Sequence, residues 1–295
     1  MKYRIFLLIS SILIFIFLPF GLKTARAANQ SEIERLLQQI EILKQKIFLL
    51  ETLSSSSQSG WEIAASAYLA VNLSNDTAIL EKNSAKSYPA ASIHKLMTAV
   101  IALENIDKNQ TITLTKGMLK PFGYSPALFP GLTISAENLI KASLIQSTND
   151  AAEALAYFLG KNKFLTLMKQ KSKELGMTNT FFYDVYGFNP ANRSTAQDLA
   201  KLLLYIYKNH PEILNITRDN DFWLPDSTGK LLKFQNVNNF YPLPDFIGGK
   251  TGYTPQAKQT LASIFSVNGD PTGIIILHSS NCQADTFTIL RKLSE

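Results

Sequence analysis

Residues 88–100 read Tyr-Pro-Ala-Ala-Ser-Ile-His-Lys-Leu-Met-Thr-Ala-Val, and they predict a buried helix that opens with a serine and a lysine. Pro89 ends the preceding segment, because proline fixes its own φ and restricts the residue before it. Apolar side chains then recur at positions 93, 96, 97, 100 and 101, the spacing of one broad helical stripe. Ser92, a common N-cap residue, is therefore expected at or near the helix N-terminus.

Ser92 and Lys95 are about one helical turn apart, so their side chains fall on the same side of the predicted helix. A hydroxyl and an amine at the positive end of a helix dipole suit a serine nucleophile whose proton passes to the lysine. The same two residues would also serve as a capping serine and a surface lysine. This motif alone does not distinguish the two interpretations.

The composition is that of a folded protein with a sizeable core. The 295 residues are 46% hydrophobic and 18% charged, which allows one large domain or two small ones. The net charge of +6 comes without a dense cluster of lysine and arginine, so no nucleic-acid partner is expected. Cys282 is the single cysteine and the three histidines are far apart in the chain, so neither a disulfide nor a metal or other cofactor is predicted.

The N-terminus has the pattern of an export signal. Lys2 and Arg4 precede an apolar run over residues 5–22, and residues 25–27 (Ala-Arg-Ala) place small side chains where a signal peptidase cuts. Residues 1–27 are expected to be a signal peptide or an uncleaved membrane anchor. Both alternatives predict export to the outer face of the cytoplasmic membrane, either secreted or N-terminally anchored, because the positive flank stays inside.

Residues 28–53 are predicted to form an amphipathic helix. Residues 31–34 (Ser-Glu-Ile-Glu) are a capping box, and apolar residues from Ile33 to Leu50 then alternate at spacings of three and four. Two interpretations stay open: a short coiled coil through which residues 31–53 self-associate, and a helix that lies on the membrane or on the main domain. A serine-rich linker follows at residues 54–60, and the main domain is expected over residues 61–295.

The main domain is predicted to be α+β. A hairpin is expected over residues 63–81, and strands are expected over residues 246–254, 260–267 and 273–278. Helices are expected over residues 135–146, 149–160, 164–175, 194–208 and 285–293, the fourth opened by a capping box at Ser194. Strands at both ends with helices between them indicate that the terminal segments share one antiparallel sheet. Residues 215–245 are rich in turn-forming residues and receive no assignment.

Two further motifs can be placed on these elements. Residues 147–149 (Ser-Thr-Asn) connect two predicted helices, and residues 250–252 (Lys-Thr-Gly) lie on a predicted strand after Gly248 and Gly249. The missing side chains of those glycines allow another group to approach the strand closely. In the order Ser-x-x-Lys, Ser-x-Asn and Lys-Thr-Gly, the motifs form the active-site signature of penicillin-binding proteins and serine β-lactamases. The first two motifs recur elsewhere in the chain, so the single Lys-Thr-Gly and the order carry the identification.

The chain resembles the low-molecular-weight penicillin-binding proteins that act as D-alanyl-D-alanine carboxypeptidases, serine peptidase family S11. The resemblance covers roughly residues 65–293 and includes residues 147–152 (Ser-Thr-Asn-Asp-Ala-Ala), 194–196 (Ser-Thr-Ala) and 249–254 (Gly-Lys-Thr-Gly-Tyr-Thr). It implies a β-lactamase/transpeptidase-like fold, in which helices flank a five-stranded antiparallel sheet and a helical subdomain lies beside it. It also implies a peptidoglycan stem peptide as substrate and β-lactam antibiotics as ligands.

The resemblance implies a catalytic role for four residues. Ser92 would attack the carbonyl between two D-alanines and form an acyl-enzyme. Lys95 would take the serine proton, and burial together with nearby Lys250 would keep its amine neutral. Ser147 would pass a proton to the leaving amine, and Asn149 would bind both the substrate backbone and Lys95.

Four residues of the strand motif are implied to bind substrate: Lys250, Thr251, Gly252 and Tyr253. Lys250 would supply positive potential, and Thr251 would bind the terminal carboxylate. The backbone N–H groups of Tyr253 and Ser92 would form the oxyanion hole.

Three features depart from the family pattern. His94 stands where small residues are usual, and we expect it to pack or to contact the surface, because adjacent helical residues point about 100° apart. Thr148 replaces a common glycine. Residues 281–285 lack the arginine with which many members hold the substrate carboxylate. The last departure leaves D,D-endopeptidase activity open beside carboxypeptidase activity.

Two other functions are possible alternatives to the one that the resemblance implies. A class A β-lactamase needs a Glu-x-x-x-Asn segment between the second and third motifs, and no glutamate between Ser147 and Lys250 has asparagine four residues later. A catalytically silent scaffold that binds peptidoglycan would not need the catalytic residue types, all of which are present. Rapid turnover of penicillin would support the first alternative, and binding of peptidoglycan fragments without covalent labelling would support the second.

Overall fold

The computed structural model of the chain describes residues 62–119, 127–226, 228–241 and 243–295. All of these residues belong to one unit, Ser56–Glu295. The predicted export signal, amphipathic helix and linker lie outside the described residues, so those assignments and self-association through residues 31–53 stay predictions. No helix within the described ranges is both long and apolar enough to cross a bilayer.

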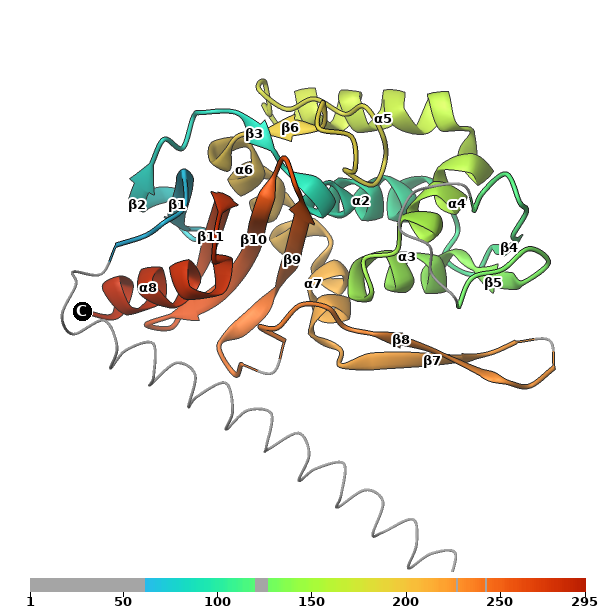
Figure 1. Cartoon of the computed structure of the whole chain (residues 1–295). Coiled ribbons are helices and arrows are strands. Elements are labelled where there is room, and N and C mark those ends of the chain that lie inside the picture. Colours follow the sequence, from blue (N-terminus) through green and yellow to red (C-terminus); the bar gives the residue numbers. More distant parts are fainter. Residues whose placement is uncertain (1–61, 120–126, 227, 242) are drawn as a thin grey trace, which may run out of the picture. The chain divides into compact units, whose positions relative to one another are not determined.

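Among the described residues, strands from both ends of the domain form one antiparallel sheet in the order β2-β1-β11-β10-β9 (Figure 1). Its strands are β1 (Ala67–Asn72), β2 (Thr77–Lys82), β9 (Phe246–Thr254), β10 (Lys258–Val267) and β11 (Asp270–Ser279). β1 and β2 are the predicted hairpin, and β9 to β11 form a meander whose second turn holds Asn268 and Gly269 at positive φ. β1 pairs with β11, with Ala67 opposite Leu277. The predicted α+β fold with one shared sheet is confirmed.

Helices cover the sheet and form a subdomain beside it. They are α2 (Lys95–Asn105), α3 (Ala136–Ile145), α4 (Asn149–Leu159), α5 (Lys161–Glu174), α6 (Ala196–Asn209), α7 (Pro211–Arg218) and α8 (Cys282–Ser294). α8 packs on β10 and β11 at one face of the sheet, while α6 packs at the opposite face (Figure 1). Ser135 accepts the N–H of Asn138 at the start of α3, which is the predicted cap.

Helix α2 lies at the centre of the subdomain and packs against α3, α4, α5, α6 and α7. The predicted apolar stripe is buried, and so is every residue from Lys95 to Ala102. The helix is preceded by a 3₁₀ turn, η1 (Ala91–His94), and His94 takes the N-cap position of α2. Ser92 therefore does not occupy the N-cap position, because the 3₁₀ turn holds this serine inside a continuous helical segment. Its expected position near the helix N-terminus is correct.

Short paired strands fix the connections between the helices. They are β3 (Tyr88–Pro89) with β6 (Arg193–Ser194), and β4 (Thr111–Thr113) with β5 (Thr133–Ser135). The predicted capping box at Ser194 is wrong, because that residue pairs with Tyr88 in β6. Thr195 instead accepts the N–H of Asp198 and caps α6.

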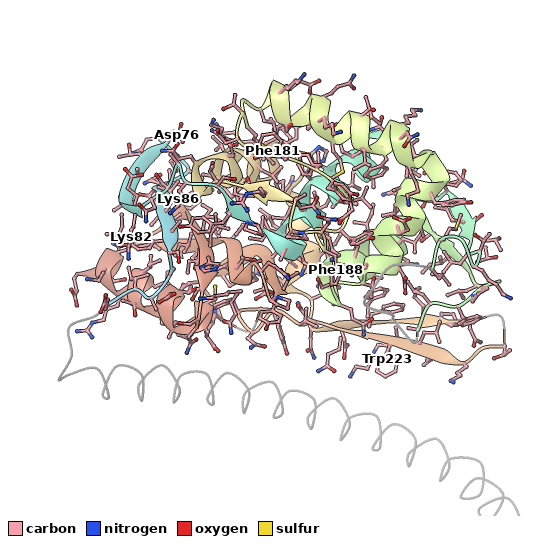
Figure 2. All side chains as sticks on the ribbon, turned by 45° about the horizontal axis from the view of Figure 1, so that its top comes forward. Asp76, Lys82, Lys86, Phe181, Phe188 and Trp223 are labelled. Carbon is pink, nitrogen blue, oxygen red and sulfur yellow. The ribbon has the colours of Figure 1, made fainter. Side chains whose placement is uncertain are left out.

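The unassigned residues 215–245 contain the end of α7 and a second hairpin. Its strands are β7 (Asp221–Pro225) and β8 (Leu231–Gln235). Phe222 and Phe234 stack on the hairpin face that packs against the core, with ring centroids 4.5 Å apart. Trp223 lies on the other face of the hairpin and is 50% exposed (Figure 2). The sequence did not predict this hairpin because both strands are short and exposed apolar residues such as Trp223 and Leu231 blur the alternation of apolar and polar positions.

Candidate active site

The three sequence motifs meet at one cleft of about 490 Å³. Its lining includes Ser92 from η1, Ser147 from the α3–α4 connection, and Thr251, Gly252 and Tyr253 from β9. The other three predicted residues, Lys95, Asn149 and Lys250, lie directly behind this lining. The structure therefore brings all eight predicted site residues together.

The turn that carries Ser92 is enclosed by two glycines. Ala91 has a φ of +50°, which a residue with a side chain adopts rarely. A Cβ at Gly187 would lie 1.9 Å from the Ala91 carbonyl oxygen, and a Cβ at Gly252 would lie 2.8 Å from the Ser92 nitrogen. Both positions need glycine, because the backbone on either side touches the serine turn directly. The glycine of the Lys-Thr-Gly motif thus allows β9 to pass beside Ser92.

Lys95 is fully buried and lies within hydrogen-bond distance of three oxygens. Its Nζ is 2.8 Å from Ser92 Oγ, 2.7 Å from Asn149 Oδ1 and 3.1 Å from the Tyr186 carbonyl oxygen. Burial lowers the pKa of Lys95 well below its ordinary value, and the nearby ammonium of Lys250 lowers it further. A lysine in this environment can hold a neutral amine against a serine hydroxyl.

Lys250 is the second buried lysine of the site. Its side chain is 1% exposed, and its Nζ donates to the Thr251 carbonyl oxygen at 3.0 Å. Burial lowers the pKa of Lys250 to about 7. Its strand is held by α7, because Gly249 N–H donates to Thr217 Oγ1 at 2.9 Å and a Cβ at Gly248 would lie 2.7 Å from Leu214. Gly248 thus lets β9 lie directly on α7, while Gly249 leaves room for Ser263 of the neighbouring strand β10.

Ser147 projects from a strained connection. Its φ of +61° is unusual for serine, and Thr148 follows as the N-cap position of α4 with its side chain buried. The Val237 N–H donates to the Ile145 carbonyl oxygen at 3.0 Å, which ties the segment after β8 to the end of α3. This tie fixes the position of Ser147 at the cleft.

The His94 ring is buried at 1% exposure and packs on Phe182, with centroids 4.9 Å apart. Burial lowers the pKa of His94 to about 4, so the ring is neutral at physiological pH. Of the two expected roles, packing is the one the structure supports.

The sequence did not identify the loop that closes this site from behind. Asp184 accepts backbone N–H groups from Tyr186, Gly187 and Asn189, and the Tyr186 carbonyl reaches Lys95. The asparagines, glycine and proline of residues 184–192 are a turn signal. That signal predicts a turn but does not tell which group the turn faces.

The far end of the cleft is built from neutral side chains. Asn281 accepts the Ala284 N–H at 3.1 Å and caps α8, while Gln259 accepts the Cys282 N–H at 2.8 Å. No charged side chain appears in the lining of the cleft within the described part of the chain. The missing arginine noted in residues 281–285 is thus not replaced there by another cation among the described lining residues.

Comparison with known proteins finds similar proteins of one family. The family model described as D-alanyl-D-alanine carboxypeptidase matches residues 52–280. The D-alanyl-D-alanine carboxypeptidase DacF of Bacillus subtilis is 31% identical over 215 residues, or 68% of this chain and 54% of DacF. A D-alanyl-D-alanine endopeptidase of Escherichia coli is 30% identical over 236 residues, or 77% of this chain and 75% of that protein. The chain thus spans about half the length of DacF and three quarters of the endopeptidase.

Solved structures share the fold. A D-alanyl-D-alanine carboxypeptidase from Mycobacterium tuberculosis superposes with a TM-score of 0.73 at 25% identity, covering 78% of this chain and 90% of that one. Penicillin-binding protein D2 from Listeria monocytogenes, in its ampicillin-bound form, superposes with a TM-score of 0.69 at 26% identity, covering 79% and 98%. The predicted penicillin-binding-protein fold is confirmed.

Proposed function

Because the chain belongs to the D-alanyl-D-alanine carboxypeptidase family, serine peptidase family S11, we propose that it cleaves the D-alanyl-D-alanine bond of peptidoglycan stem peptides. One observation carries the proposal. The Lys95 amine lies 2.8 Å from Ser92 Oγ, at the point where the Lys-Thr-Gly strand passes beside the serine. A nucleophile, a base and a backbone donor strand in this arrangement are what acyl transfer requires.

The chemistry proceeds in two steps, acylation of Ser92 and hydrolysis of the acyl-enzyme. The neutral Lys95 amine takes the proton of Ser92 as Oγ forms a bond to the penultimate D-alanine carbonyl carbon. The C–N bond to the last D-alanine then breaks, and the leaving amine receives a proton by way of Ser147. Water attacks the resulting ester, loses a proton to Lys95, and releases the shortened peptide while Ser92 recovers its hydroxyl.

Residues of β9, together with Asn149, are expected to bind the substrate. Thr251 offers a hydroxyl to the substrate carboxylate, and Lys250 behind it supplies positive potential. The N–H groups of Ser92 and Tyr253 stabilise the oxyanion. A β-lactam has the same carbonyl and carboxylate arrangement, so it acylates Ser92 and leaves slowly. Penicillin-binding protein D2, which shares this fold, was solved in ampicillin-bound form.

Endopeptidase activity on crosslinked peptides is the second candidate. The described lining of the cleft beyond Thr251 presents neutral amides such as Gln259 and Asn281, without a cation to select a free terminal carboxylate. An endopeptidase relative covers the chain as fully as the carboxypeptidases do. Two assay substrates separate the activities. A carboxypeptidase releases D-alanine from a stem peptide that ends in D-alanyl-D-alanine, whereas an endopeptidase cleaves a crosslinked dimer.

The proposed substrate lies outside the cytoplasmic membrane. The basic, apolar and small-residue pattern of residues 1–27 supports export of the chain to that side.

Covalent labelling tests the proposal. The full-length chain is incubated with a fluorescent penicillin, and the modified peptide is mapped by mass spectrometry. We expect one adduct on Ser92 that is absent from Ser92→Ala and present in Ser172→Ala, which removes a buried serine of α5 that hydrogen-bonds its own helix. Labelling that persists in Ser92→Ala would refute the assignment of the nucleophile. Rapid loss of the label would point to a β-lactamase.

A further inference from the structure

The three oxygens around Lys95 differ in what they can do. Asn149 Oδ1 and the Tyr186 carbonyl oxygen only accept hydrogen bonds, whereas Ser92 Oγ can also donate. A neutral amine has two N–H donors and one lone pair. The two obligate acceptors therefore take both N–H groups, and the lone pair faces the hydroxyl hydrogen of Ser92. The base is aimed at the nucleophile only while both acceptors are held in place.

We propose that Asp184 is a positioning residue of this active site, which fixes the Tyr186 carbonyl against Lys95 and so aims the amine at Ser92. This inference rests on the proposed function, because it assigns Asp184 to the acylation of Ser92.

One peptide unit connects the two side chains. The carbonyl of Tyr186 and the N–H of Gly187 belong to the same planar unit, and in a trans unit they point in opposite directions. The N–H donates to Asp184 Oδ1 at 2.5 Å, and the carbonyl accepts from Lys95 at 3.1 Å. Asp184 therefore holds one side of the plane while the other side contacts the base.

The remaining contacts of Asp184 close the same turn. Its Oδ1 also accepts the Tyr186 N–H at 3.0 Å, and its Oδ2 accepts the Asn189 N–H at 2.9 Å. Its own N–H donates to Asn192 Oδ1 at 3.1 Å. The turn is also pressed against the serine turn at Gly187, where a Cβ would meet Ala91. Asp184 is thus anchored between the loop that it closes and the turn that carries Ser92.

Asp184 acts on Lys95 in a second way, because the charge of its carboxylate affects the pKa of the Lys95 amine. The ionisable groups around Lys95 are Lys250 from β9, Asp184 from the loop and His94 from the preceding turn. Burial and Lys250 lower the pKa of Lys95, and the Asp184 carboxylate opposes that shift. The phenol of Tyr186 stays neutral, since burial and then Asp184, Glu153 and Asp150 raise its pKa to about 12.

Two substitutions separate charge from geometry. Asp184→Asn removes the charge and keeps the one oxygen that accepts the Tyr186 and Gly187 N–H groups, while its amide nitrogen cannot accept the Asn189 N–H. Asp184→Ala removes the charge and both oxygens. The matched control is Asp226→Asn, because Asp226 also closes a turn by accepting backbone N–H groups, from Thr228 at 2.8 Å and Lys230 at 3.0 Å, in the β7–β8 hairpin.

The measurement is the rate constant for acylation of full-length protein by a fluorescent penicillin, taken across pH. The rate rises with pH as Lys95 loses its proton. We expect Asp184→Asn to move this acid limb to lower pH, since the charge that favoured protonated Lys95 is gone, with the maximal rate within about 3-fold of wild type. Asp184→Ala is expected to lower the maximal rate at least ~10-fold, because the base is no longer aimed. Asp226→Asn leaves both quantities unchanged.

The outcomes distinguish this inference from the proposed function. If the acid limb of Asp184→Asn coincides with that of wild type, Asp184 does not act on the base and the inference fails, although labelling of Ser92 stands. If Asp184→Ala is folded by circular dichroism and acylates at the wild-type rate, the aiming role also fails. If Asp184→Ala does not fold, the limb of Asp184→Asn decides alone. A wild-type chain that is never labelled refutes the proposed function, and the inference with it.

Discussion

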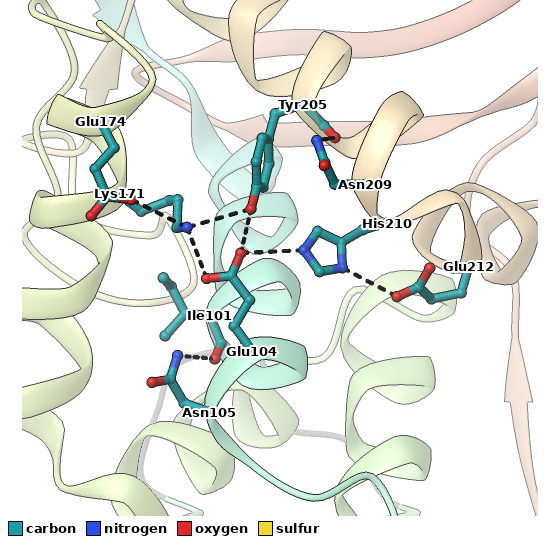
Figure 3. A network of polar contacts seen from close by, with 9 residues as sticks. All are labelled: Ile101, Glu104, Asn105, Lys171, Glu174, Tyr205, Asn209, His210 and Glu212. Atoms are coloured by element: carbon teal, nitrogen blue, oxygen red, sulfur yellow. Dashed lines mark hydrogen bonds and ion pairs between the residues drawn. The ribbon is translucent and has the colours of Figure 1, made fainter.

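The two ends of helix α2 each hold a lysine amine in a polar cluster, and the two clusters behave in opposite ways. At the start of the helix, Lys95 contacts only neutral oxygens and lies near a second cation, Lys250. At its end, Glu104 binds Lys171 from α5 through a 3.0 Å ion pair and also accepts from Tyr205 at 2.6 Å (Figure 3). The same residue type is thus a candidate base at one end and a structural clamp at the other.

The difference is explained by the partners. Burial lowers the pKa of both lysines, but hydrogen bonds to Glu104, Glu174 and Tyr205 raise that of Lys171 above its ordinary value. Lys95 has no hydrogen-bonded carboxylate: Asp184 is directed at backbone N–H groups of its own turn, and its charge opposes the lowering of the Lys95 pKa without cancelling it. Burial alone does not make a reactive lysine. Burial together with the placement of the counter-charge away from the amine does.

Arginine at the two positions gives the largest expected contrast. Arginine cannot lose its proton at any accessible pH, so Lys95→Arg removes the base and is expected to slow penicillin acylation by about 10²–10⁴-fold. Lys171→Arg keeps the charge that pairs with Glu104 and is expected to acylate within about 2-fold of wild type. Stopped-flow or gel-based labelling of both full-length variants measures these rates. A fast Lys95→Arg enzyme would mean that another group takes the serine proton.

The start of α2 also differs from its end in how pH affects stability, because burial disfavours the protonated form of the His94 ring. Burial lowers the pKa of His94 from 6.5 to about 4. Between these values the unfolded chain binds a proton that the native chain does not, so the free energy of unfolding falls as the pH falls from about 6.5 to 4. The loss from this group is about 3 kcal/mol.

His94→Met removes this contribution. Urea unfolding at pH 7 and at pH 4 is therefore expected to show a smaller pH-dependent loss in the variant than in wild type, by about 3 kcal/mol. The comparison uses the difference between the two pH values, so any packing change in the variant cancels. Equal losses in both proteins would mean that the native chain protonates the His94 ring as readily as the unfolded chain does.

The start of α2 was largely predictable from sequence because its information is local. The apolar stripe after Ser92 and each of the three motifs taken singly are patterns within a few residues, and the same holds for the turn around Asn268 between β10 and β11. The 3₁₀ turn that carries Ser92 was not predicted, since the capping preference of serine does not reveal such a turn before a helix. The contribution of Asp184 could not be predicted, because its partners are backbone N–H groups and a carbonyl whose direction only the folded loop determines.

The polar cluster at the end of α2 could not be predicted from the sequence at all. Glu104 meets Lys171, Tyr205 and His210, which come from α5, α6 and the junction before α7. None of these residues belongs to a motif, and no local spacing connects them. Their meeting depends on how the helices pack around α2, which is a property of the whole fold.

The smallest expected effect tests whether this second cluster is only structural. Hydrogen bonds from Tyr205, Lys171 and His210 outweigh burial and lower the pKa of Glu104, so its stabilisation is complete above the ordinary value of 4.5 and is lost as the pH falls below it. Glu104→Gln is expected to reduce the free energy of unfolding at pH 7 by about 1–2 kcal/mol. The difference from wild type should shrink on acidification below that value.

Glu137→Gln is the matched control, because Glu137 forms an exposed pair with Lys141 one turn away on α3 and is expected to contribute less than about 0.5 kcal/mol. Penicillin acylation by Glu104→Gln should stay within about 2-fold of wild type, since the substitution leaves Ser92 and Lys95 untouched. A larger loss of acylation in a folded Glu104→Gln protein would mean that the clamp at the end of α2 also governs the alignment of the base at its start. The two clusters would then be mechanically coupled through the buried helix α2. The contrast between them would describe their charge but not their function.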